Sequence, residues 1–466
     1  MLATRWPAIV AVLLAAAPCA AAVENGVDWP RFLGPSGDSR SPETGIATTW
    51  GPCGPPLLWQ RKLGSGYGIG SVARGRFYQF DRHEDRNRLV CLDSRSGRLV
   101  WTFEYPTDYE DLLNYNNGPR STPLVDDGRV YIFGPEGMLH CLRADDGELL
   151  WKVDTTAAFG VVQNFFGVGT SPVVAGDLLI VMIGGSPPES QTAGRFDLDR
   201  VKGNGSGIVA FDKRTGARRY QLSDELASYA TPRLATIDGR PWCFVFARGG
   251  LVAFDPGPGK VDFQYPWRAR LRDSVNAATP VVVGDEVLIS ECYGPGSSLL
   301  QVRPGGYDVV WRDGPGRDKA LKLHWNTPVY HDGYVYGSSG RHSGEAELRC
   351  VEWKTGRVIW SRPGLRRSSL LYVDGYFVCL SEDGVLRLIK ATPKGYQQVA
   401  KSIVRETPDG VPLLKPPAWA APILSHGLLY VRGDDRLVCL RLSKADNAEN
   451  HHGMQVPLFR GFASEK

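Results

Sequence analysis

Polar and aromatic side chains recur where long loops run into short apolar stretches, and these are the residues whose types could do chemistry. The loop ends read NNGPRSTP, QNFFGVGTSP, DSVNAATP, LHWNTP and PPAWAAP, and a further loop reads GSSGRHSGEAEL. Together they supply nine candidates, namely Asn117, Arg120, Asn164, Asn276, His324, Asn326, Arg341, His342 and Trp419. Amide, guanidinium and imidazole groups beside an aromatic ring suit a polar or anionic ligand. The set therefore predicts a ligand-binding funnel.

Each of these residue types also has a structural interpretation. An Asn ahead of a strand commonly bonds the nearby backbone, and an Arg at a loop rim is commonly solvated. His342 lies among polar loop residues, where an imidazole can titrate near neutrality or have no role. Further arginines stand in neighbouring loops, namely Arg268, Arg270, Arg272, Arg366 and Arg367.

Recognised catalytic patterns are missing from the sequence. It has no His-Glu-x-x-His, no Gly-x-Ser-x-Gly, no phosphate loop, no Cys-x-x-Cys and no Cys-x-x-Cys-His haem site. The acids in the candidate loops, Asp108, Asp111, Glu291 and Glu345, follow no motif. The net charge of +4 gives no argument for nucleic acid. We therefore assign no catalytic residue and no metal ligand.

A repeated unit must position these loops. LVCLDSRSGRLVW at 89–101 returns as LHCLRADDGELLW at 139–151 and as LRCVEWKTGRVIW at 348–360, with Cys, Gly and Trp at the same offsets. IVAFDKRTGARRY at 208–220 keeps Asp and Gly and replaces Trp by Tyr. A period of about 50 residues indicates a repeat architecture. The 54 Gly, 33 Pro, 13 Trp and 18 Tyr favour an all-β fold.

Eight apolar openings, often introduced by Thr-Pro or Ser-Pro, mark the units. They begin at Ser71, Ser121, Thr170, Ala230, Ala278, Asn326, Ser369 and Ala420. Four antiparallel strands per unit at this period predict an eight-bladed β-propeller. The last copy supplies only three strands, so we expect 56–63 to close it as the fourth. The stretch KATPKGYQQVAK at 390–401 lacks the Gly-Trp ending, which leaves seven blades as the fallback.

Connections in an antiparallel blade alternate between its two ends, so loop lengths sort by end. Short Gly-containing turns, such as Asp127-Gly128 and Asp332-Gly333, gather at one end, called the short-turn face here. The other end, the long-loop face, receives 104–120, 154–169, 185–206, 267–277, 312–325, 340–347 and 405–419. Long loops on a rigid scaffold usually carry function. We expect the site on the long-loop face.

The repeated Trp and Cys are expected to be structural. Trp59, Trp101, Trp151, Trp311 and Trp360 are predicted to dock neighbouring blades. Cys91, Cys141, Cys350 and Cys439 share one repeat position, so they lie in successive blades, too far apart for a disulfide. We expect them to be small buried hydrophobes.

The chain divides into four segments. Residues 1–22 resemble a secretory signal, with Arg5, an apolar run from Ala8 to Ala17 and small residues up to Ala22. That run is too short to span a bilayer, and Pro18 before Cys19 argues against a lipid anchor. Next come an extended segment at 23–55, the propeller at 56–443 and a polar tail at 444–466. The predicted product is an exported monomer, periplasmic or extracellular, without a transmembrane segment.

The Leu-Asp-x-x-x-Gly-x-x-x-Trp unit, as in Leu92–Trp101, resembles the tryptophan-docking repeat of pyrroloquinoline quinone (PQQ) dehydrogenases and their non-enzymatic relatives. Those relatives include the propeller lipoprotein of the outer-membrane β-barrel assembly machinery. The resemblance covers nearly all of 56–442 and implies the propeller fold. For the enzymes it also implies a disulfide between adjacent cysteines beside the quinone, calcium held by Glu, Asn and Asp, and an Asp base. No two cysteines are adjacent here.

Two functions from different classes follow. The first is a non-catalytic exported propeller that binds a protein, a peptide or a small polar or anionic ligand at the long-loop face, with envelope assembly as one setting and no cofactor. The alternative is a PQQ-dependent dehydrogenase with calcium that oxidises an alcohol or a sugar. The first is preferred because the scaffold comes without recognisable catalytic residues.

Overall fold

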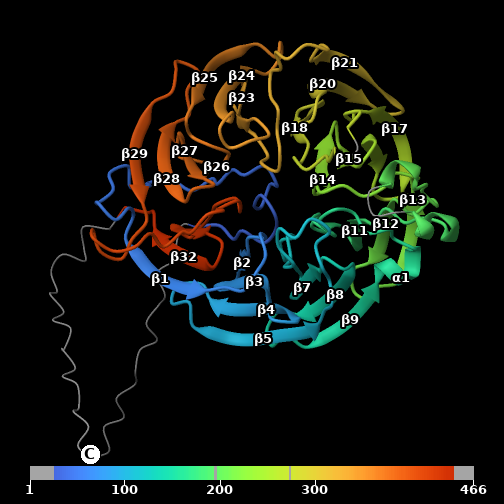
Figure 1. The fold of residues 1–466 in the computed structure, drawn as a ribbon, viewed down its shortest axis with the longest axis horizontal. Coiled ribbons are helices and arrows are strands. Elements are labelled where there is room, and N and C mark those ends of the chain that lie inside the picture. The colour runs from blue at the N-terminus through green and yellow to red at the C-terminus, as the bar shows by residue number, and fades with distance from the viewer. Residues whose placement is uncertain (1–25, 194–196, 272–273, 445–466) are drawn as a thin grey trace, which may run out of the picture.

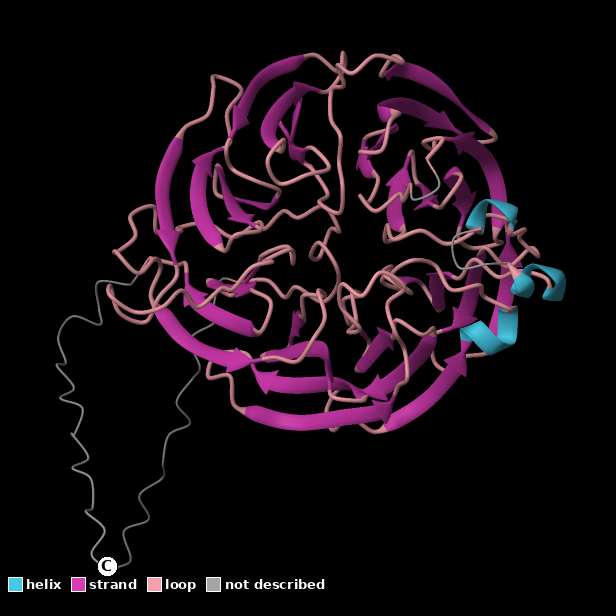
Figure 2. Ribbon diagram, viewed as in Figure 1, coloured by secondary structure: helices cyan, strands magenta, loops and turns pink. Residues whose placement is uncertain are grey.

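The computed structural model describes residues 26–193, 197–271 and 274–444, so the predicted signal and nearly all of the predicted tail lie outside the described residues. Eight four-stranded antiparallel sheets form a ring, as Figure 1 shows. The predicted eight-bladed β-propeller is therefore confirmed, and the fallback of seven blades is not needed. Figure 2 shows that nearly all regular structure is strand.

The blades follow one another along the chain, and the eighth joins both ends of the propeller. Blades 1 and 2 contain β2 (Ser71–Ala73), β3 (Arg76–His83), β4 (Arg86–Asp93), β5 (Leu99–Pro106), β6 (Leu124–Asp126), β7 (Arg129–Phe133), β8 (Met138–Arg143) and β9 (Leu149–Asp154). Blades 3 and 4 contain β10 (Val173–Ala175), β11 (Leu178–Met182), β12 (Ile208–Asp212), β13 (Arg218–Leu222), β14 (Arg233–Ile237), β15 (Arg240–Phe246), β16 (Gly250–Asp255) and β17 (Lys260–Pro266). Blades 5 and 6 contain β18 (Val281–Val283), β19 (Glu286–Glu291), β20 (Gly296–Arg303), β21 (Gly306–Arg312), β22 (Val329–His331), β23 (Tyr334–Ser339), β24 (Glu347–Glu352) and β25 (Val358–Pro363). Blades 7 and 8 contain β26 (Ser368–Val373), β27 (Tyr376–Ser381), β28 (Val385–Lys390), β29 (Gln398–Ile403), β30 (Ile423–Ser425), β31 (Leu428–Arg432), β32 (Arg436–Arg441) and β1 (Leu57–Lys62).

Turn chemistry sets the two faces of the ring. The hairpin between β6 and β7 turns at Asp127 (φ 47°) and Gly128 (φ 71°). A two-residue turn with positive φ at both positions matches the twist of the flanking strands. This turn lies on the short-turn face, while the connections that leave the outer strands lie on the opposite face. The long-loop face also carries the only helices in the described part of the chain, α1 (Thr155–Phe159) and the 3-10 helices η1 (Pro188–Thr192) and η2 (Leu198–Arg200).

The repeated Trp of one blade lies against the glycine turn of the next. Trp101 Nε1 in blade 1 donates to the carbonyl of Ala144 in blade 2 at 3.1 Å. A Cβ on Gly147 (φ 78°) would lie 2.6 Å from the ring of Trp101, so only glycine fits there. The other predicted docking residues make the same kind of indole bond, namely Trp59 to Ser94, Trp151 to Lys213, Trp311 to Trp353 and Trp360 to Thr392. Each bond joins two neighbouring blades.

Blade 7 lacks this Trp for a geometric reason. Ala400 occupies the position, paired with Leu388 in the register that pairs Cys91 with Trp101 in blade 1. The outer strand of blade 8 is β1, which comes from the other end of the propeller, so β32 has no tight turn into it. A docking Trp on blade 7 would have no glycine turn to cover. Trp50 and Leu57 instead pack against the hydrophobic cluster shared by blades 1, 7 and 8.

Both chain ends of the propeller meet in blade 8, as predicted. β1 pairs antiparallel with β32, with Trp59 opposite Cys439 and Lys62 opposite Arg436. The four repeated cysteines are fully buried, which confirms their prediction as small hydrophobes. The eight cysteines among the described residues are all unpaired.

An N-terminal strap, residues 26–50, crosses the central axis at the short-turn face and appears blue near the centre of Figure 1. Trp29 pairs with Val72 in blade 1, and the carbonyl of Pro30 accepts from Val125 in blade 2 at 2.8 Å. Farther along, Arg40 bridges to Tyr372 in blade 7, and Ile46 bridges to Ser443 beside blade 8. The strap therefore connects blades 1 and 2 with blades 7 and 8.

Candidate functional site

A cavity of about 440 Å³ occupies the central axis and opens toward the long-loop face; it is called the axial cavity here. Its lining includes Phe32 and Leu33 of the strap together with loop residues such as Tyr115 and Trp419. A smaller cavity of about 20 Å³ lies against the same two strap residues, and its lining also includes Arg233 and Thr279 of the blades. Phe32 and Leu33 therefore lie between the two cavities and form the floor of the larger one.

Six of the nine predicted residues line the axial cavity. They are Arg120, His324, Asn326, Arg341, His342 and Trp419. Asn164 lines a different cavity, and Asn117 and Asn276 are in the lining of neither.

The Asn side chains bond the backbone, which matches their structural interpretation. Asn276 is fully buried and donates to the carbonyl of Ala247 at 2.7 Å. Asn326 donates to the carbonyl of Ser338 at 2.8 Å, and Asn164 to that of Ala227 at 3.1 Å. Asn117 Oδ1 accepts from the backbone of Asp111 at 2.9 Å. These amides hold the loops in place, which leaves the arginines and aromatic rings as the groups that could contact a ligand.

The cavity wall is cationic and aromatic. Three arginines line it, Arg120, Arg341 and Arg367, and no Asp or Glu occurs among its lining residues in the described chain. Aromatic rings come from loops all round the axis and were largely absent from the sequence prediction, namely Tyr67, Tyr115, Phe165, Phe166, Tyr229, Tyr293 and Trp325. In the sequence, Trp325 stands directly between the predicted His324 and Asn326, which was the available signal.

Arg120 is held from behind by a buried acid. Its guanidinium bonds Asp111 Oδ2 at 2.6 Å, and Asp111 is 2% exposed. The rings of Tyr67 and Phe166 lie 5.5 and 5.3 Å from the guanidinium carbon. Burial, charge pairing and aromatic contacts together orient this cation toward the cavity.

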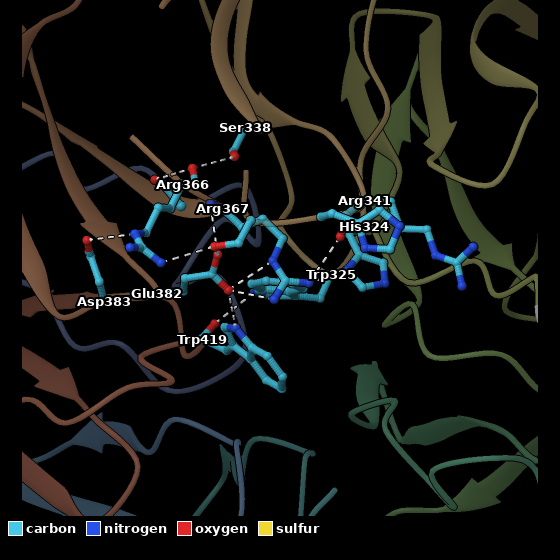
Figure 3. A network of polar contacts seen from close by, with 12 residues as sticks. His324, Trp325, Ser338, Arg341, Arg366, Arg367, Glu382, Asp383 and Trp419 are labelled. Carbon is cyan, nitrogen blue, oxygen red and sulfur yellow. Dashed lines mark hydrogen bonds and ion pairs between the residues drawn. The ribbon is translucent and has the colours of Figure 1, made fainter. Parts of the chain in front are cut away.

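Arg367 is the centre of a second network on the wall formed by blades 5 to 8, shown in Figure 3. Its Nε and Nη2 bond Glu382 Oε2 at 2.9 and 2.6 Å. Trp419 Nε1 donates to the same oxygen at 3.0 Å. The guanidinium carbon lies 4.4 Å from the ring centroid of Trp325 and 5.3 Å from that of Trp419. Two indoles and one carboxylate therefore fix a cation in the cavity wall.

His324 is a neutral member of this network. Burial, followed by the charges of Arg367 and Arg341, lowers the pKa of His324 to about 3. Arg367 Nη1 can only donate, so Nδ1 of His324 accepts at 3.3 Å and the ring proton is on Nε2. Nε2 then donates to the hydroxyl of Tyr293 at 3.2 Å. His324 thus orients Tyr293 and stays uncharged at neutral pH, whereas His342 is exposed.

Glu382 should make stability depend on acidity. Burial disfavours the Glu382 carboxylate, but hydrogen bonds from Arg367, Ser343 and Trp419 outweigh burial and hold its pKa at about 2, against an ordinary 4.5. A lowered folded-state pKa stabilises the fold above the unfolded pKa, and this stabilisation is lost as pH falls from about 4.5 toward about 2. We expect the difference in unfolding free energy between the wild type and Glu382→Gln to be constant above pH 5 and to shrink below it. Urea unfolding across this range measures the difference, and a difference that does not change with pH would contradict the assignment.

Comparison with known proteins identifies two groups of relatives. The family profile described as outer membrane protein assembly factor BamB matches residues 55–182 and 113–362. Quinohemoprotein alcohol dehydrogenase ADH-IIG of Pseudomonas putida is 22% identical over 310 residues, which is 62% of this chain and 37% of that protein. Outer membrane protein assembly factor BamB of Yersinia pestis is 28% identical over 125 residues, 27% of this chain and 26% of that protein. The chain thus aligns with well under half the length of these relatives.

Solved structures show the same fold. BamB from Moraxella catarrhalis superposes with a TM-score of 0.54 at 15% identity, covering 85% of this chain and 98% of that one. Quinohemoprotein alcohol dehydrogenase from Comamonas testosteroni gives a TM-score of 0.50 at 14% identity, covering 90% and 81%. At these identities the likeness concerns the fold alone.

Proposed function

The chain belongs to the family described as outer membrane protein assembly factor BamB, and on that premise we propose that it is a non-catalytic propeller that binds a carboxylate-bearing ligand in its axial cavity. The observation that carries the proposal is the cavity wall, where three arginines and many aromatic rings line the space without a carboxylate among the described lining residues. A guanidinium keeps its charge at neutral pH, and a hydrogen bond between a cation and a carboxylate is stronger than a neutral one. The ligand is a small carboxylate or the carboxylate of a bound peptide.

Two of the cavity arginines are already held in place by buried acids before a ligand binds, which supports specific binding. Asp111 and Glu382 already orient the guanidinium groups of Arg120 and Arg367, so little side-chain freedom is lost when a ligand arrives. The two arginines precede β6 in blade 2 and β26 in blade 7, so cations face the axis from different sides of the ring. A ligand with two anionic groups around a flat apolar centre fits this arrangement.

The setting we propose is the bacterial envelope. Residues 1–22 resemble an export signal, and the assembly factors among the relatives are named for the outer membrane. In the described chain, no helix has the length and apolarity needed to cross a bilayer.

Isophthalate, a flat aromatic dicarboxylate, tests the proposal. We expect saturable one-to-one binding, measured by calorimetry and by a change in intrinsic tryptophan fluorescence, because the indoles of Trp325 and Trp419 line the cavity. The matched control ligand is isophthalamide, which has the same shape without charge and should bind at least about tenfold more weakly, since a charge-assisted hydrogen bond is stronger than a neutral one. Equal binding of the two ligands, or no binding of isophthalate, would contradict the proposal.

The dehydrogenase relatives supply a second candidate, a PQQ enzyme, but the residues present do not fit it. Calcium takes oxygen ligands that include carboxylates, and the described lining of the axial cavity contains no carboxylate. No three His, Cys, Asp or Glu side chains gather within the described residues as a metal site would require, and no two cysteines are adjacent. With PQQ and calcium added, we expect no dye-linked oxidation of an alcohol; turnover would favour this second candidate.

A further inference from the structure

A second cavity of about 440 Å³, called the lateral cavity here, lies beside the axial cavity. It is lined by the loop after β5, by the stretch that follows α1, and by the connection after β11. The loops 107–120 and 161–170 contribute residues to both cavities and separate them. The lateral cavity therefore has its own walls and its own chemistry.

The charge of the lateral cavity is opposite to that of its neighbour. Asp108, Glu110 and Glu136 line it, and its single arginine among the described lining residues is Arg248. The guanidinium of Arg248 bonds Asp199 Oδ1 at 3.2 Å, and the three acids in the lining outnumber it. Asp108 and Glu110 are exposed, while Glu136 is partly buried. The lateral cavity thus favours a cation.

Glu136 is oriented by donors and still has room to accept. Its Oε1 accepts from the hydroxyl of Tyr105 at 2.8 Å, and its Oε2 accepts from the amide of Asn87 at 2.9 Å and from the hydroxyl of Thr107 at 3.4 Å. A carboxylate has about four lone-pair directions. An ammonium group could therefore bond this carboxylate without displacing the existing donors.

Two buried hydroxyl groups in the wall lack partners. Tyr109 and Thr170 are 5% and 1% exposed, and neither hydroxyl oxygen has a hydrogen-bond partner among the described residues. Both residues line the lateral cavity. A buried polar group without a partner is costly, so a ligand that donates hydrogen bonds would relieve this penalty.

Aliphatic side chains supply much of the remaining wall, beside the polar Thr156, Gln163, Asn164 and Ser228. Leu112, Val161, Met182, Leu198 and Leu226 surround the polar groups. A ligand for this space needs an alkyl body and cationic ends, because acids lie both at the exposed rim and inside.

We propose that the lateral cavity is a binding site for a linear aliphatic diamine. One ammonium group bonds the Glu136 carboxylate and the free hydroxyl groups, the alkyl chain lies along the aliphatic wall, and the second ammonium group lies beside Asp108 and Glu110. This site is independent of carboxylate binding in the axial cavity, and either one can fail without the other.

Titration calorimetry with 1,5-diaminopentane tests the proposal on the whole protein. We expect saturable one-to-one binding that weakens with added salt, since exposed charges are screened. The matched control ligand, 1,5-pentanediol, has the same length without charge and should show no saturable binding. Absence of diamine binding, or equal binding of the diol, would overturn the proposal.

Variants locate the site. Glu136→Gln should weaken diamine binding at least tenfold, and the exposed pair Asp108→Asn with Glu110→Gln, which leaves the core intact, should weaken it several-fold. The control pair Asp145→Asn with Glu148→Gln removes the same charge from an exposed turn of the short-turn face and should change nothing. Isophthalate binding should survive in all three variants. Unchanged diamine affinity in both cavity variants would overturn the assignment.

Discussion

Trp101→Ala is expected to lower the free energy of unfolding by about 3–5 kcal/mol, the range for truncating a large buried aromatic side chain. Trp101 is 9% exposed, fills the space between blades 1 and 2, and donates to the carbonyl of Ala144. The substitution leaves a void and removes one of two donors to that carbonyl, which keeps the hydroxyl of Tyr78 at 3.3 Å. Denaturant unfolding of the purified protein measures the change.

Leu99→Ala provides the control on the same strand. Leu99 is 47% exposed, two residues before Trp101, so its truncation should change stability by no more than about 0.5 kcal/mol. If the two substitutions destabilise the protein equally, the repeated Trp does not dock the blades.

Arg367→Gln is expected to weaken isophthalate binding by at least about tenfold, because it removes charge-assisted hydrogen bonds and a cation stacked on two indoles. It also leaves Glu382 buried without its partner, so stability must be measured alongside affinity. Arg367→Lys keeps the charge but loses the planar fork, and we expect an intermediate affinity.

Arg303→Gln is the matched control for this prediction. Arg303 is an exposed arginine in β20, at the turn into β21 on the short-turn face, and it too pairs with an acid, Asp308. Its loss should leave isophthalate binding unchanged. A similar loss of affinity in both variants would show that the ligand responds to overall charge and not to the axial cavity.

The repeat made the blade count predictable, because each apolar opening reports one blade and the Trp59 ending without its own opening reports the closure. Blade 7 looked irregular in sequence because Ala400 replaces the Trp. The structure explains this: blade 8 takes β1 as its outer strand and so has no glycine turn to cover. The missing Trp of blade 7 thus follows from how the ring closes in blade 8, which the local sequence of blade 7 does not indicate.

The candidate site was predictable as a face but not in its chemistry. Loop lengths predicted that the site lies on the long-loop face. The side-chain amide of Asn276, however, donates to the carbonyl of Ala247, a contact that no residue spacing in the sequence indicates. The Arg367, Glu382 and Trp419 network joins residues from three separate connections. The cavity floor at Phe32 comes from a strap whose path over the ring rests on long-range pairing. Long-range contacts of this kind are not encoded in local periodicity.

A crystal structure with isophthalate bound tests the central claim most directly. We expect ligand density in the axial cavity, above Phe32, with a carboxylate within hydrogen-bond distance of Arg120 or Arg367 and the ring against Trp325 or Trp419. Density at another surface, or an empty axial cavity at a ligand concentration that saturates binding in solution, would contradict it.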